Sequence, residues 1–147
     1  MKAKMKNFYV LFLCIFLFSA CKKETSPGSL TQIIQLEINA VHWSAEVASW
    51  ASSGGSQQIN SLTKSDGSFM QIFLPLDTIG TFLASDNIVT VAYNDGTDMY
   101  SNNVSGTVVL TRNSANEIEG TFNLEVASYF TSDTLDFKDG SFYWSSI

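Results

Sequence analysis

The sequence predicts an all-β protein, an antiparallel β-sandwich of about eight to ten hairpin-linked strands with an up-and-down β-barrel as the alternative. Apolar and polar residues alternate with a period of two through most of the chain after residue 30, and no window holds a helical period of 3.6. Turn residues recur between these runs, and an apolar segment at the N-terminus predicts a signal helix ahead of the domain.

The first predicted strand contains Ile34, Leu36 and Ile38 on one face, with glutamine and glutamate between them. Asn39-Ala40 then turns the chain, and residues 41–43 begin the return strand. The same alternation predicts strands over residues 58–64, 69–74, 88–93, 107–112 and 118–126, and a final strand that includes residues 142–144. In the 118–126 strand, Phe122, Leu124 and Val126 share one face, whereas Thr121, Asn123 and Glu125 share the other. In the final strand, Phe142 and Trp144 face one way and Tyr143 the other.

The turns are predicted from their chemistry. Asp-Gly between apolar runs is a strong hairpin signal, and it occurs in residues 65–68, 94–97 and 138–141. Residues 113–116 give a fourth turn, and Pro75 ends a strand because it has no backbone N–H to donate to a ladder.

The N-terminus has the three parts of a secretory signal. Three lysines precede an apolar run over residues 8–18, and Ser19-Ala20 supplies small residues before a cleavage site. Residues 17–21 resemble the lipobox of bacterial lipoproteins, which implies that Cys21 is the lipid attachment site, although Phe18 stands where an aliphatic residue is usual. We therefore predict a lipoprotein signal peptide over residues 1–20, a flexible Ser-Pro-Gly tether over residues 21–30 and the β-sandwich domain over residues 31–147.

This anchor defines the expected location. The membrane would be a partner through the lipid on Cys21, and the protein is expected at the outer membrane or cell surface, with a periplasm-facing position as the alternative. From Cys21 onward the chain has 5 basic and 14 acidic residues, which argues against nucleic acid as a partner.

Catalytic chemistry has little support in the sequence, so we expect no enzyme, no catalytic residues and no cofactor. His42 is the only histidine, and no serine lies in a Gly-x-Ser-x-Gly elbow. The unfavoured alternative is an enzyme that uses His42 or a carboxylate pair, either Glu117 with Glu119 or Asp133 with Asp136.

Two features suggest ligand binding. Asp95 and Asp98 give a weak calcium candidate, but the spacing of a helical calcium loop is absent and a plain turn accounts for both residues, so no metal is expected. The aromatic residues Trp50, Tyr100 and Tyr143 are candidates for stacking on sugar rings, which would require at least two exposed and roughly coplanar rings. The bland explanation is that aromatic residues fill the core of the domain.

The whole chain resembles a group of small uncharacterised Bacteroidota lipoproteins. The resemblance lies in the lipobox and in residues 33–43, 106–110, 118–122 and 139–142, and it departs from the pattern at Ala40, where a glycine is usual. It implies an all-β, lipid-anchored domain and carries no catalytic residues. We therefore expect a lipid-anchored cell-envelope protein that is a non-enzymatic binding or structural module, with a glycan or an envelope protein as its partner; a carbohydrate-binding surface lipoprotein is the main alternative.

Overall fold

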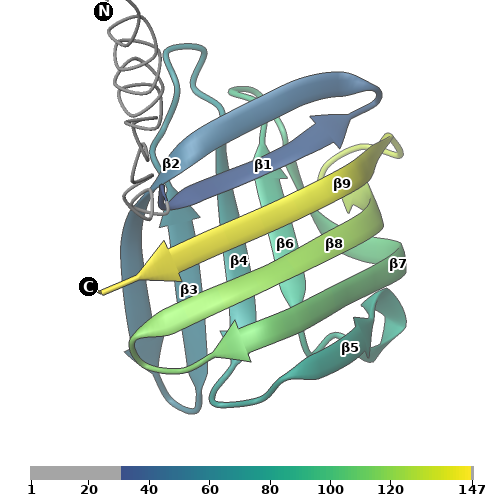
Figure 1. The fold of residues 1–147 in the computed structure, drawn as a ribbon. Coiled ribbons are helices and arrows are strands. Elements are labelled where there is room, and N and C mark those ends of the chain that lie inside the picture. The colour runs from purple at the N-terminus through teal and green to yellow at the C-terminus, as the bar shows by residue number, and fades with distance from the viewer. Residues whose placement is uncertain (1–30, 147) are drawn as a thin grey trace, which may run out of the picture.

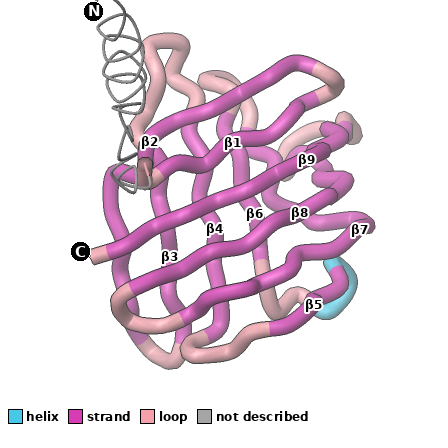
Figure 2. Tube along the Cα trace, viewed as in Figure 1, coloured by secondary structure: helices cyan, strands magenta, loops and turns pink. Residues whose placement is uncertain are grey.

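The computed structural model describes residues 31–146, so the predicted signal peptide (residues 1–20) and the predicted tether (residues 21–30, with Cys21) lie outside that range. The described chain forms nine β-strands and one short 3₁₀ helix (Figures 1 and 2). The strands are β1 (Ile33–Ile38), β2 (Val41–Ser53), β3 (Ser56–Ser61), β4 (Phe69–Pro75), β5 (Gly80–Leu83), β6 (Thr90–Asn94), β7 (Met99–Asn113), β8 (Glu117–Ser128) and β9 (Thr134–Ser145), and the helix η1 spans Ala84–Asp86.

The strands close into an eight-stranded antiparallel barrel with β5 as an extra strand. Neighbouring strands follow chain order, except that β4 pairs with β6 because β5 pairs with β7 instead. The ladders between β1 and β9 and between β7 and β8 complete the circle. The all-β, hairpin-linked fold is confirmed, and of the two predicted arrangements the closed barrel, given as the alternative to the sandwich, is the one that forms.

The hairpin turns follow from local chemistry. Asn39 and Ala40 both have positive φ values, 48° and 66°, as a two-residue turn between twisted strands requires. The predicted turns at residues 65–68, 94–97 and 113–116 are confirmed, and β4 ends at Pro75. The strand limits differ most in β7, which extends back from the predicted residue 107 to Met99.

The predicted turn at residues 138–141 is wrong, because these residues lie inside β9. Asp139 has a φ of 50°, and the pairing of β9 shifts by one residue against both β1 and β8 at this point. Asp-Gly therefore forms a β-bulge here. The strand continues past it because Ser141 and Phe142 find partners on both neighbouring strands.

The interior of the barrel is filled by side chains. Phe122, Leu124 and Val126 share one face as predicted, and this face points inward, as does the predicted common face of Phe142 and Trp144. A series of edge-on or tilted ring contacts runs through the core, joining in turn Trp43, Tyr93, Phe137, Phe122 and Phe142. Eight strands enclose a space that side chains just fill, so the described core has the dimensions expected of a packed barrel.

The two ends of the barrel carry different loops. At one end, which we call the entry end, β1 begins and β9 ends, together with the turns at residues 54–55, 76–79 and 114–116. The other end, which we call the aromatic end, holds the loops at residues 39–40, 62–68, 95–98 and 129–133. In Figure 1 the start of β1 and the end of β9 lie on the left, and the loop from β8 to β9 lies on the right.

Candidate functional site

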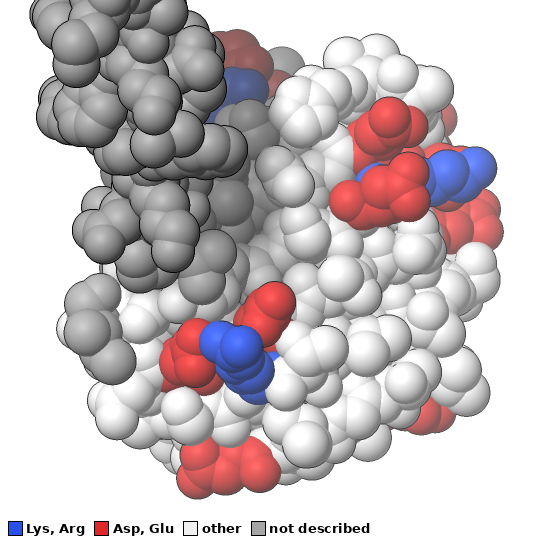
Figure 3. Space-filling model, in the orientation of Figure 1, with Lys and Arg blue, Asp and Glu red and all other residues white. Residues whose placement is uncertain are grey.

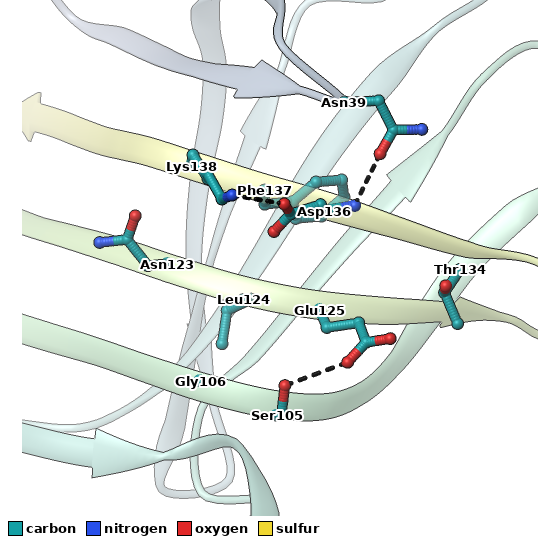
Figure 4. Close-up of a pocket in the computed structure, with 10 residues that line it drawn as sticks. All are labelled: Asn39, Ser105, Gly106, Asn123, Leu124, Glu125, Thr134, Asp136, Phe137 and Lys138. Atoms are coloured by element: carbon teal, nitrogen blue, oxygen red, sulfur yellow. Dashed lines mark hydrogen bonds and ion pairs between the residues drawn. The ribbon is translucent and has the colours of Figure 1, made fainter.

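The outer wall of the barrel contains a hollow of about 460 Å³ across strands β7, β8 and β9 (Figure 4). Its polar lining comes from β7, β8, β9 and the turn between β1 and β2. Leu124 and Phe137 also line it, although their side chains are buried in the core. The polar lining residues are Asn39, Ser105, Asn123, Glu125, Thr134, Asp136 and Lys138.

Irregularities in the strands produce this hollow. The pairing of β7 with β8 shifts between Asn103 and Ser105, and the bulge at Asp139 displaces β9 on the other side of β8. Between them, Gly106 has a φ of 106° and lies so close to the backbone of Asn123 that a Cβ atom would collide with it. Gly106 thus allows the backbones of β7 and β8 to approach more closely than any residue with a side chain would permit.

Hydrogen bonds fix the polar groups in the hollow. The Asn39 side chain accepts from the Asp136 backbone N–H at 2.9 Å, and the Ser105 hydroxyl donates to Glu125 at 3.2 Å (Figure 4). Lys138 Nζ lies 2.8 Å from Asp136 Oδ2, and this hydrogen bond raises the pKa of Lys138. Within the described chain, the amide nitrogens of Asn39 and Asn123 have no partner. Carboxylates and free amides held in this way suit a ligand that carries several hydroxyl groups.

The three predicted ligand-binding aromatics do not come together. Tyr100 is only 7% exposed, and burial raises the pKa of its hydroxyl. Trp50 is half-buried at the entry end, where its ring stacks on Trp144 at 4.9 Å and its indole N–H donates to Gln57. Tyr143 lies half-buried on the outer wall, and its hydroxyl donates to Glu117 at 3.3 Å. The structure therefore places Tyr100 inside the barrel, Trp50 at the entry end and Tyr143 on the outer wall.

Asp95 and Asp98 use their oxygens to hold loops. Asp95 Oδ1 accepts from the backbone of Asp98, from the Thr97 hydroxyl and from the Thr97 backbone, and these hydrogen bonds lower its pKa. Asp98 accepts from the Met99 backbone and, through its other oxygen, from the Ser128 hydroxyl at 2.7 Å. No group of three potential metal ligands among histidine, cysteine, aspartate and glutamate occurs in residues 31–146.

The residues of the unfavoured enzyme alternative are dispersed. His42 is exposed beside the first turn, and Asp133 and Asp136 lie in or next to the β8–β9 loop. Glu117 and Glu119 share a face of β8 and both pair with Arg112, whose pKa is raised mainly by its hydrogen bond with Glu117. In Figure 3, basic side chains lie beside acidic ones in two groups on the visible face, and further acidic side chains lie alone near its lower edge.

The sequence interpretation did not single out the loop from β8 to β9. Tyr129 and Phe130 lie there next to each other, and each is 74% exposed. The sequence could have indicated this loop, because the alternating pattern of β8 is followed directly by two consecutive aromatic residues. These are followed in turn by Thr-Ser-Asp, a polar turn sequence. Two large apolar residues placed just beyond a strand have no core to enter.

The comparisons with known proteins identify a family and no activity. Residues 30–144 match a family described as a domain of unknown function, DUF6252. No curated protein and no solved structure matches the chain. Within residues 31–146, no helix has the length and apolar character needed to cross a membrane. With its match covering most of the 147 residues, the chain belongs to the DUF6252 family of domains of unknown function.

Proposed function

We propose that this protein is a non-enzymatic binding or structural module held at the cell envelope by a lipid on Cys21. The observation that carries the proposal is the combination of a filled barrel with a polar hollow on its outer wall. Ring contacts and aliphatic side chains occupy the described interior, so a ligand meets the protein on its outside.

The anchoring half of the proposal rests on the leader and on the direction of the chain. The lysines, the apolar run and the small residues before Cys21 form a lipoprotein signal, and residues 21–30 have the composition of a flexible linker. Because β1 begins at the entry end, a lipid on Cys21 would attach the barrel through that end. The hollow lies on the wall, away from the start of β1, and would stay accessible.

Mass spectrometry of the mature N-terminus tests the anchor. We expect the wild-type protein to begin at an acylated Cys21 and to fractionate with membranes, and the Cys21→Ser variant to lose both properties. An unmodified N-terminus elsewhere in the chain would contradict the proposal.

A second candidate, carbohydrate binding, is favoured by the hollow. Asn39, Asn123, Glu125 and Asp136 place amides and carboxylates around one depression, and such groups bind vicinal hydroxyls in pairs. This site differs from the predicted aromatic one, and it has polar groups in place of a stacking ring.

A glycan array separates this candidate from the general proposal. Thr134 is exposed at the margin of the hollow, so Thr134→Trp should obstruct the hollow without disturbing the core. Thr121→Trp is the matched control, since Thr121 is an exposed threonine of β8 that does not line the hollow. Glycan binding that is lost in Thr134→Trp and kept in Thr121→Trp supports the candidate; binding by neither the wild type nor the control would eliminate it.

A further inference from the structure

The most exposed aromatic side chains among the described residues are neighbours in one loop. Tyr129 and Phe130 are each 74% exposed, and their ring centroids are 5.1 Å apart with the planes at 83°. We call this pair the aromatic tip. Single exposed apolar residues are ordinary, but two large rings in contact form a compact apolar surface whose burial by a partner would be favourable.

The loop that carries the aromatic tip is held in place by Ser128. The Ser128 hydroxyl donates to Asp98 and accepts from the backbone N–H groups of Phe130 and Thr131, each at 2.9 Å. The backbone N–H of Tyr129 also donates to the Met99 carbonyl at 2.7 Å. These bonds fix the backbone that presents the rings, so a partner would meet them with less ordering cost than on a loose loop.

The loops around the aromatic tip are acidic. The loops of the aromatic end contain Asp66, Asp95, Asp98 and Asp133, against the single basic residue Lys64. Lys64 lies over the ring of Trp43, with Nζ 5.4 Å from its centroid. The turns at the entry end contain one charged residue, Asp77. Exposed aromatic rings and a local excess of carboxylates thus occur together at one end of the barrel.

We propose that the aromatic end is a docking surface for a basic segment of a protein partner. Lysine or arginine side chains of that segment would contact the faces of Tyr129 and Phe130 by cation–π interactions and pair with the carboxylates of Asp98 and Asp133. The apolar stems of the same side chains would cover the rings. The proposal goes beyond the proposed function, because it names a second surface and the chemistry of its partner.

The charges favour a basic protein over a lipid surface. Anionic lipids repel a rim of four aspartates, whereas a basic peptide gains from each of them. The position of the tip agrees, because the β8–β9 loop lies at the end of the barrel opposite the start of β1. A tether that enters beside β1 would therefore hold the aromatic tip away from the membrane.

Selection from a random library of displayed 12-residue peptides tests the proposal. The bait is the full chain with Cys21→Ser, immobilised through its N-terminus so that the aromatic end is free. We expect the selected peptides to be rich in lysine and arginine and to bind less tightly as salt concentration rises. The double variant Tyr129→Ser/Phe130→Ser should weaken their binding by about tenfold or more, as removal of buried aromatic anchors does.

The control variant is Ile79→Ser. Ile79 is 65% exposed at the entry end, so this change removes an exposed apolar residue of the opposite end and should leave peptide binding unchanged. Circular dichroism and thermal midpoints show whether both variants fold. The proposal is overturned if no peptide is enriched, if the enriched peptides carry no basic excess, or if they bind the double variant as tightly as the wild type. Retention on phosphatidylcholine/phosphatidylglycerol vesicles that depends on the aromatic tip would also overturn it, in favour of a lipid surface.

Discussion

Replacement of Asn113 by alanine should destabilise the barrel at its entry end. The side chain is 8% exposed and joins three segments. Its amide nitrogen donates to the carbonyls of Pro75 and Thr78 at 2.8 and 2.7 Å, and its oxygen accepts from Gln57, which is 2% exposed. The substitution removes all three hydrogen bonds, including the two that join the connection between β4 and β5 to the end of β7.

The size of the expected loss in the free energy of unfolding depends on which hydrogen-bond partners the neighbouring groups keep after the substitution. A hydrogen bond contributes about 1 kcal/mol net to stability, and a buried group left without a partner costs more. The Thr78 carbonyl belongs to an exposed residue and regains a bond to water, and Gln57 keeps its bond to Pro75 at 3.2 Å. We therefore expect Asn113→Ala to lower the free energy of unfolding by about 2 to 3 kcal/mol.

Urea unfolding followed by circular dichroism measures this loss. The slope of the free energy against urea concentration should stay the same while the midpoint falls. Asn102→Ala is the control, because Asn102 lies on the same strand but is exposed, and its replacement should change stability by less than about 0.5 kcal/mol. A loss below about 1 kcal/mol in Asn113→Ala, or an equal loss in the control, would refute the reasoning.

Three further predictions concern backbone strain, packing and pH. Ala40→Gly should raise the free energy of unfolding by up to about 1 kcal/mol in the same urea assay, because Ala40 has a φ of 66° that glycine adopts without strain; a loss would contradict this. Gly140→Ala should lower it by about 1 to 3 kcal/mol, since a Cβ at that position collides with the ring of Phe122, and unchanged stability would show that the ring moves freely. The pKa of Asp95 is lowered from 3.8, so the stability it contributes is present above about pH 3.8 and is lost as pH falls through its folded-state pKa. Asp95→Asn keeps a side-chain oxygen but cannot titrate. Its urea midpoint should therefore fall less steeply than that of the wild type between about pH 5 and about pH 2. Parallel curves for the two proteins would contradict this.

The strands and their buried faces were predictable because they depend on local sequence. Alternation alone put Phe122, Leu124 and Val126 on one face of β8 and Tyr143 on the opposite face of β9 from Phe142 and Trp144, because a strand turns successive side chains to opposite faces. The turn at Asn39-Ala40 was equally local.

Asp-Gly shows where local sequence stops being sufficient. The pair makes a turn at Asp66-Gly67 and at Asp95-Gly96 but a bulge at Asp139-Gly140. A turn forms when the chain reverses onto itself, and a bulge forms when two other strands continue to pair with the residues that follow. The difference lies in residues far away along the chain.

The sequence by itself determined that the chain is all-β, hairpin-linked and built on alternating faces, and it provided the leader on which the predicted lipid site depends. Only the tertiary structure decided that β1 pairs with β9, which closes the barrel and separates the entry end from the aromatic end. It also decided which side chains meet: Trp50 stacks on Trp144, and Asn39, Asn123 and Asp136 gather around one hollow. The physical reason is that side-chain direction is a local property of the backbone, whereas strand order, register and proximity depend on contacts between residues distant in sequence.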